Sequence, residues 1–272
     1  MTKDLTVGSP MGLILNFGLP TLLGMLFQQF YNLMDTMIVG KLLGAQALAA
    51  VGSTSSINFF VIGFCMGVCS GFAIPVAQRM GAGDYARMRR HVANAAYLSI
   101  LFATVLTVAT GLLCRTILTV MNTPGDIFAD AERYIFIIFM GIPTTFLYNL
   151  LAGILRSLGD SRTPVYFLAL SSVLNIALDF AFILWFDAGV AGAAIATVVS
   201  QVASALLTLR CIIGSEGMPW HVSLDKMRIE PGILGAICTI GIPAAAQSAM
   251  YNLSNMVIQS CMNSFGTDTI AA

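Results

Sequence analysis

Long stretches without a charged side chain constrain this chain more than any other feature of its sequence. Asp, Glu, Lys and Arg are absent from five runs: 42–78, 91–114, 134–155, 188–209 and 231–267. Two further runs, 5–40 and 163–186, are each interrupted by one acid, Asp35 and Asp179 respectively. A helix needs about 20 apolar residues to cross a bilayer, so every run is long enough. The runs predict seven spans, at 13–39, 47–76, 92–113, 131–154, 163–186, 189–210 and 232–262.

The low charge content excludes several classes of protein. The 13 basic and 13 acidic residues make up 10% of the 272-residue chain, whereas an ordinary soluble domain has roughly 25% charged residues. The net charge of zero removes any case for electrostatic capture of nucleic acid. No run alternates with the period of two that a membrane β-barrel needs. We therefore predict an all-α polytopic membrane protein embedded in the lipid bilayer, with no enzymatic activity, no cofactor and no nucleic-acid partner.

The basic residues predict the orientation of the chain. With the N-terminus inside, the segments on the cytoplasmic side contain Lys3, Arg79, Arg87, Arg89, Arg90, Arg156, Arg162, Arg210, Lys226 and Arg228. The outer side contains only Lys41, Arg115 and Arg133. Because cytoplasmic loops carry an excess of Lys and Arg, we expect a multi-pass protein of the cell membrane with a cytoplasmic N-terminus.

Two short motifs occur twice and in the same order. The tripeptide 18–20 (GLP) returns as 241–243 (GIP), and 43–50 (LGAQALAA) aligns with 265–272 (FGTDTIAA). The offset is 223 residues at the proline and 222 at the second motif. Because six predicted spans separate the copies, both copies enter the membrane from the same side. This pattern indicates a parallel repeat of two six-helix lobes, as in many secondary transporters.

The second copy contains only its first helix. We predict an N-terminal six-helix lobe over 1–213, a cytoplasmic connector over 214–230, and the first helix of an incomplete second lobe over 231–272. A complete two-lobe protein would have about 440–450 residues, twice the repeat offset. We therefore expect the chain to be a fragment of a twelve-helix transporter, with the missing C-terminal lobe supplied in cis or in trans.

Two acids lie inside predicted spans, where each costs about 2.5–3.5 kcal/mol on insertion scales and is therefore a candidate functional residue. At 1.5 Å per residue, Asp35 lies about 9 Å and Asp179 about 10 Å from the outer ends of their helices. Thr197 lies about 12 Å from the outer start of the sixth span. Asn175 precedes Asp179 by one turn, so both share one helix face.

These four residues form a candidate cation-coupling site. Two carboxylates, an amide and a hydroxyl at one depth can hold a Na⁺, and the paired acids can instead hold a proton. Asn175 and Thr197 could also serve only to bond neighbouring helices. Pro20 allows a bend in the first span, which would couple helix shape to the state of Asp35; a static kink would explain the same proline.

Three stretches resemble sequence motifs of the multidrug and toxic compound extrusion (MATE) transporters. The segment 153–164 (GILRSLGDSRTP) is similar to the family's cytoplasmic signature after the fourth span. The segments 35–40 (DTMIVG) with 43–44 (LG), and 78–84 (QRMGAGD), resemble family motifs of the first and second spans. Asn175 and Asp179 lie where the family has cation residues of its N-terminal lobe.

The resemblance implies a multidrug efflux antiporter that exports organic cations in exchange for H⁺ or Na⁺. On this basis Asp35, Asn175, Asp179 and Thr197 would form the coupling site, and Tyr31, Asn32, Tyr148 and Asn149 would line a substrate cavity. Some sodium-coupled members carry a glutamate in the seventh span, whereas 231–267 contains no acid. This departure favours coupling through the acids of the first lobe.

Three alternatives remain open from the sequence. A lipid-precursor flippase of the same superfamily would share the architecture, although no predicted span interior contains the Arg or Lys that an anionic diphosphate lipid requires. An intramembrane aspartyl protease would need two facing acids, and the literal string 81–84 (GAGD) lies in a basic loop instead. Finally, the chain could be an inactive fragment.

Overall fold

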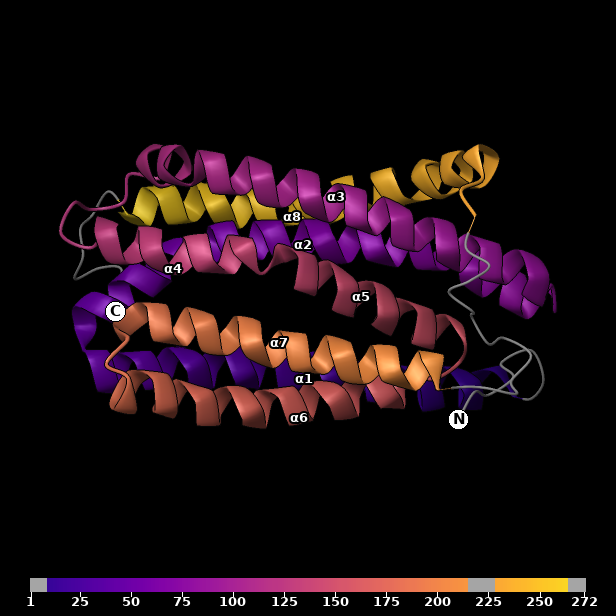
Figure 1. Cartoon of the computed structure of the whole chain (residues 1–272), viewed down its shortest axis with the longest axis horizontal. Coiled ribbons are helices and arrows are strands. Elements are labelled where there is room, and N and C mark those ends of the chain that lie inside the picture. Colours follow the sequence, from indigo (N-terminus) through magenta and orange to yellow (C-terminus); the bar gives the residue numbers. More distant parts are fainter. Residues whose placement is uncertain (1–8, 215–227, 264–272) are drawn as a thin grey trace.

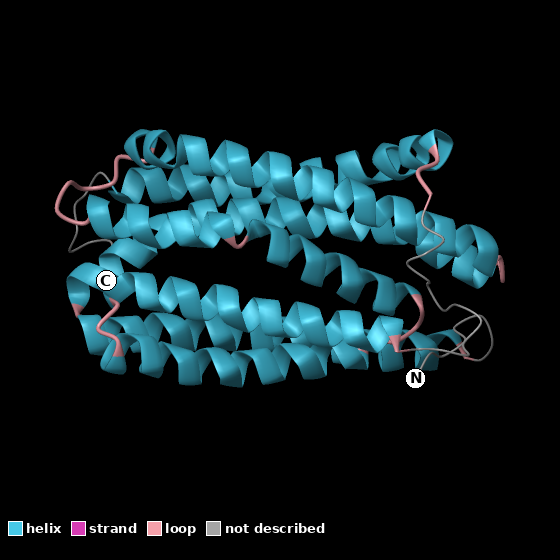
Figure 2. Ribbon diagram, in the orientation of Figure 1, coloured by secondary structure: helices cyan, strands magenta, loops and turns pink. Residues whose placement is uncertain are grey.

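The protein is described by a computed structural model over residues 9–214 and 228–263, a part of the chain that contains helices and no strand (Figure 2). The helices are α1 (Pro10–Leu43), α2 (Ala45–Gly81), α3 (Tyr85–Val120), α4 (Phe128–Met140), α5 (Ile142–Ser157), α6 (Arg162–Phe180), the π-helical η1 (Ala181–Trp185), α7 (Gly189–Ile213) and α8 (Pro231–Asn263). Six segments are long and apolar enough to cross a membrane, one of them α6 continued by η1, and the bent pair α4–α5 gives a seventh when it is counted as one span. Each predicted span therefore corresponds to a helix or to this bent pair.

The fourth span is bent by 45° between α4 and α5. The bend lies at Gly141, two residues before Pro143, which has no backbone N–H to continue the helical ladder. The Gly141 carbonyl instead accepts from the backbone N–H groups of Thr144 and Thr145, at 3.0 and 3.1 Å. A side chain at Gly141 would come within 2.6 Å of Val198 on α7. By contrast, α1 and α8 continue as helices through Pro20 and Pro243.

The bend leads α5 from one group of helices to another. In Figure 1, α2, α3, α4 and α8 lie together above, and α1, α6 and α7 lie together below. α5 leaves the upper group and runs obliquely toward α7 at the right of the view. We call that side of the bundle the basic end, because its turns and helix termini contain Arg79, Arg87, Arg89, Arg90, Arg156, Arg162, Arg210 and Arg228.

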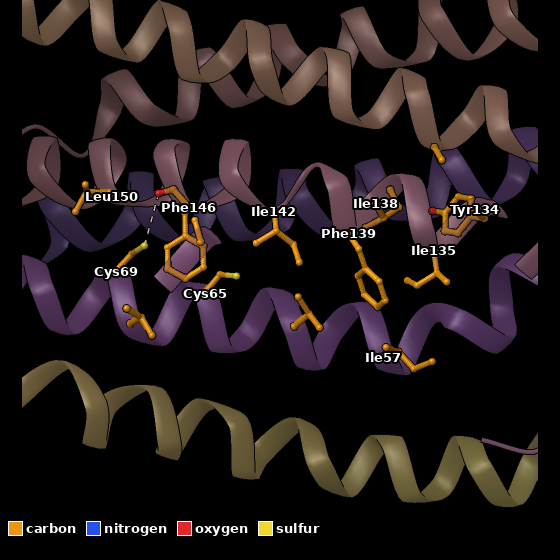
Figure 3. Packing of buried hydrophobic residues seen from close by; sticks show 14 of the residues in the cluster. Ile57, Cys65, Cys69, Tyr134, Ile135, Ile138, Phe139, Ile142, Phe146 and Leu150 are labelled. Carbon is orange, nitrogen blue, oxygen red and sulfur yellow. Dashed lines mark hydrogen bonds between the residues drawn. The ribbon is translucent and has the colours of Figure 1, made fainter. Parts of the chain in front are cut away.

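The helix α2 is the centre of the apolar core. In the most apolar 18-residue segment of α2, 56% of the residues are buried. In the corresponding segment of α1 only 6% are buried, and the surface of α1 is largely exposed. Apolar side chains of α4 and α5 pack along α2, among them Ile135, Phe139 and Phe146 (Figure 3). The Cys69 thiol lies 3.6 Å from the Phe146 carbonyl oxygen and contacts the same interface.

Glycines bring α8 into direct backbone contact with α2. A β-carbon on Gly71 would lie 2.5 Å from the Gly241 Cα, and one on Gly67 would lie 2.8 Å from the Ala244 carbonyl oxygen. Close approach of this kind supplies van der Waals packing, which drives helix association within a bilayer. Helix α8 therefore packs on α2, with a smaller contact to α3. Residues 215–227 of the predicted connector and the repeated motif 265–272 lie outside the described residues, and the domain boundaries stay predictions.

We expect Gly71→Ala to destabilise the packing of α8 on α2. The added methyl group meets backbone, which cannot rotate away, so the cost should be about 1–3 kcal/mol as in other overpacked sites. The measurement is thermal unfolding in detergent. The control is Gly235→Ala on α8, where the new methyl group has no neighbour within 4 Å; equal stability of the two variants would contradict the contact.

An aspartate organises the turn between α5 and α6. Asp160 Oδ1 accepts from the backbone N–H groups of Arg162 and Thr163, at 3.1 and 3.0 Å, and Oδ2 accepts from the Thr163 hydroxyl at 2.6 Å. Burial raises the pKa of Asp160, but the hydrogen bonds from the Thr163 side chain and backbone lower it, and the net result is a pKa below the ordinary value. The segment 153–164 thus owes part of its pattern to capping of α6.

Asp160→Ala should cost about 1 kcal/mol of stability, the usual effect of losing a helix cap. Because the pKa of Asp160 is lower in the folded state, its contribution is complete above the unfolded value of about 3.9 and is lost as the pH falls through the folded value. Unfolding curves of the parent and the variant should therefore converge only at strongly acidic pH. A difference that is unchanged under those conditions would refute the ionised cap.

Candidate functional site

The two acids of the predicted site come together inside the helix bundle. Asp35 on α1 is 8% exposed and Asp179 on α6 is fully buried. Their carboxyl groups lie within hydrogen-bonding reach of each other. One oxygen of each, Oδ1, has no hydrogen-bond partner. Two negative charges cannot be kept side by side in a low-dielectric interior without a compensating proton or cation. When both acids are ionised, the pair therefore needs a proton or a cation to offset its charge.

Asn175 and Thr197 complete the predicted group of four. With the Asn175 amide oriented to match its neighbours, Nδ2 donates to Asp179 Oδ2 at 3.0 Å and Oδ1 accepts from the Thr197 backbone N–H at 3.2 Å. Thr197 Oγ1 donates to the Ala193 carbonyl at 3.1 Å within α7. Asn175 is fully buried because it lies one turn from Asp179 on the face of α6 that packs against α7. The amide thus fixes the orientation of one acid.

Two tyrosines border the acids. The Tyr31 hydroxyl, one turn before Asp35, donates to Thr197 Oγ1 at 3.2 Å and so joins α1 to α7. The sequence predicts Tyr31 in the substrate cavity, without a connection to the acids. Tyr134 on α4, which is not among the predicted site residues, is 5% exposed and lies close enough to Asp35, Asp179 and Tyr31 for electrostatic interaction. The sequence shows only that Tyr134 lies near the outer end of the fourth predicted span, which does not by itself connect it to the acids.

A cavity lies between the acids and the basic end, and Tyr31 is the one residue discussed with the acids that also lines it. It is a partly open space of about 510 Å³, its mouth included, between α1, α2, α5, α6 and α7. The lining consists mainly of hydroxyl, amide and aromatic groups: Gln28, Tyr31, Ile62, Thr145, Tyr148, Asn149, Leu168, Ser171, Ser172, Ser200, Gln201 and Ser204. A second hollow of about 390 Å³ shares Ile62, Thr145 and Gln201 with it and reaches Thr197. Neither lining contains a charged side chain.

The other predicted site residues divide between the cavity and its surroundings. Tyr148 and Asn149 line the cavity, and the Asn149 amide donates to the Thr145 carbonyl at 2.8 Å. Asn32 is not among the lining residues; its amide faces Gln29 Oε1 on its own helix, at 3.5 Å. Pro20 lies within α1, four turns from Asp35, and its role in bending stays a prediction. Helical periodicity could have found Ser171, Ser200 and Ser204, which continue the faces of Asn175 and Thr197.

Few oxygen atoms around the two acids lack a hydrogen-bond partner. The described residues contain no group of three or more His, Cys, Asp or Glu side chains that could hold a metal. The Asn175 oxygen faces the Thr197 backbone, and the Thr197 hydroxyl is already bonded to Tyr31 and Ala193. Two carboxylate oxygens therefore remain, whereas a hard cation coordinated by oxygen takes about six ligands.

Comparison with known proteins finds the same architecture. The family model MatE matches residues 20–181. The chain is 33% identical over 98% of its length to the probable multidrug resistance protein YpnP of Bacillus subtilis, covering 60% of that protein. It is 25% identical to the multidrug export protein MepA of Staphylococcus aureus, covering 95% of this chain and 57% of that protein. The chain thus spans a little over half the length of these curated relatives.

Solved structures agree on the fold. A crystal structure of MATE in the bent conformation matches with a TM-score of 0.82 and 28% identity, over 90% of this chain and 55% of that one. A MOP superfamily transporter from Pyrococcus furiosus matches with a TM-score of 0.83 and 27% identity, over 91% and 55%. The predicted fold class is therefore confirmed: an all-α polytopic membrane chain that corresponds to about half of such a transporter. With a family model matched over more than half of its residues, the chain belongs to the MatE family of multidrug and toxic compound extrusion transporters.

Proposed function

We propose that this chain forms the ion-coupling lobe of an antiporter that exports organic cations in exchange for protons. The observation that carries the proposal is the contact between Asp35 and Asp179, buried in helices that cross the membrane. The MatE family is a family of transporters, and relatives of this chain are named for multidrug resistance and export. A further lobe, in cis or in trans, would complete the transport path.

The proton is the ion that the site accommodates most simply. One proton placed between the two carboxyl groups removes one of two adjacent negative charges and gives an unpartnered oxygen a hydrogen bond. Loss of this proton restores the electrostatic repulsion between Asp35 on α1 and Asp179 on α6. Because the Tyr31–Thr197 bond also joins α1 to α7, movement of α1 would be transmitted to the wall of the cavity.

The lining of the cavity favours a cationic, amphipathic substrate. Tyr31 and Tyr148 offer aromatic faces, to which organic cations are attracted. The alternative is a flippase for an anionic lipid precursor, which would need Lys or Arg in the lining, and neither hollow contains one. For the Pyrococcus furiosus transporter, reverse polarity of the binding pocket suggests a different function.

Asp179→Asn should abolish ethidium efflux from cells that produce the full-length protein containing this chain. The amide keeps the shape of the carboxyl group but cannot release a proton, so the export cycle stops while insertion into the membrane is preserved. Asp187→Asn is the matched control, because Asp187 is exposed and its positive φ of 47° suits asparagine. Normal efflux by Asp179→Asn would refute the assignment. Efflux driven by a sodium gradient alone would show that the coupling ion is Na⁺ and not a proton.

We propose that the basic end faces the cytoplasm, with the N-terminus on that side, in accordance with the positive-inside rule. A cysteine introduced by Gly159→Cys, in the turn between α5 and α6, should react with a membrane-impermeant maleimide only in inside-out vesicles. The comparison uses a background without the six native cysteines. Reaction in intact cells would invert the topology.

A further inference from the structure

The cavity stops well before the basic end of the bundle. Its last lining residues in that direction are Tyr148 on α5, Leu168 on α6 and Ser204 on α7. At 1.5 Å per residue, Tyr148 and Ser204 are each about 13 Å from the end of their helices, and Leu168 is about 9 Å from the start of α6. A barrier therefore separates the cavity from the basic end.

The tyrosine at this boundary links α5 to α6. The Tyr148 hydroxyl donates to the Pro164 carbonyl of α6 at 3.3 Å. Ser204 on α7, which is 3% exposed, lines the same end of the cavity, and its hydroxyl oxygen has no hydrogen-bond partner. The polar tip of a buried tyrosine needs a partner such as the Pro164 carbonyl, whereas its ring fills the space between helices. Tyr148 thus marks where the polar lining of the cavity ends.

Beyond Tyr148 the bundle is tightly packed. Ala152 and Leu155 on α5 are 1% and 3% exposed, and Thr208 on α7 is fully buried. The bend at Gly141 makes this closure possible, because it directs α5 toward α7 near the basic end (Figure 1). A straight fourth span would leave the side of the cavity that faces α7 without this cover.

A positively charged side chain lies beyond Tyr148, toward the basic end. Arg156 follows Tyr148 by two turns of α5, and the two side chains interact electrostatically. A fixed arginine near a narrow passage repels protons and other cations, as in membrane channels that exclude them. The ring thus provides a steric barrier and the guanidinium an electrostatic one.

We propose that Tyr148 and Arg156 form a seal between the interior cavity and the cytoplasm. An antiporter must not connect its coupling acids to both sides of the membrane at once, because protons would then cross without substrate. The seal would prevent that leak. Its purpose rests on the proposed antiport, but its existence as a barrier is a property of this lobe alone and can be tested without transport.

The test measures the accessibility of single cysteines from the cytoplasmic face of inside-out vesicles, in the background without native cysteines. In the chain with Tyr148 intact, Gly159→Cys should react rapidly with a membrane-impermeant methanethiosulfonate, and Ser204→Cys should not. Equal rates at the two positions would overturn the seal. This comparison introduces no cavity at Tyr148, so it does not depend on how the chain tolerates a truncated tyrosine.

Removal of the ring should open the path. Tyr148→Ala should raise the labelling rate of Ser204→Cys by about tenfold or more, because labelling follows the exposed population. Tyr148→Phe keeps the ring and should leave the rate low. The rate at Gly159→Cys serves as the folding control and should stay constant. An unchanged rate at Ser204→Cys in the Tyr148→Ala background would refute the role of the ring.

The coupling role has a separate readout. In proteoliposomes with an imposed pH gradient and no substrate, Tyr148→Ala and Arg156→Gln in the full-length protein should each increase proton leak. Unchanged leak in both variants would show that the barrier does not protect coupling. Failure of the proposed antiport would appear instead as normal ethidium efflux by Asp179→Asn, which leaves the labelling contrast unaffected.

Discussion

The contact between two buried carboxyl groups is the interaction on which the interior of this lobe depends. Asp35 and Asp179 lie where no water shell offsets their charge, and they come from helices that are distant in sequence. The groups around the pair that offset the cost of burying these charges are a fixed amide, a threonine backbone N–H and two tyrosine rings, and none of them is a basic side chain. A local arginine would neutralise the pair permanently. No basic side chain of the described part of the chain acts on this pair, so in the proposed antiport a mobile ion would balance the charge.

The sequence was sufficient for the helices and for the four polar residues at one depth. Charge-free runs set the spans because the bilayer permits so few backbone solutions, and Asn175 and Asp179 share a face by simple helical spacing. Tyr134 could not be connected to the acids in the same way. Its position near the acids depends on how α4 packs against α2 and α7, which no periodicity along one helix records.

The bend at Gly141 shows a second limit of the sequence. Pro143 is compatible with a bend, but neither the angle nor the direction of a bend follows from a proline alone. At the bend, Val198 of α7 occupies the space that a side chain at Gly141 would need. Likewise, the sequence places Asn32 beside Tyr31, but consecutive helix residues point about 100° apart, and of these two only Tyr31 lines the cavity.

The hydroxyl groups that line the cavity are mostly satisfied by neighbouring backbone. Ser200 donates to the Thr197 carbonyl at 2.9 Å, and Ser172 donates to the Leu168 carbonyl at 2.9 Å. Each of these carbonyls belongs to a helix. When the hydroxyl rotates away, few polar atoms of the backbone are therefore left without a hydrogen-bond partner. Such a wall is stable when empty, yet it can present donors in many different patterns to whatever enters. Chemical tolerance would then arise from rotation about single side-chain bonds, with the backbone framework unchanged.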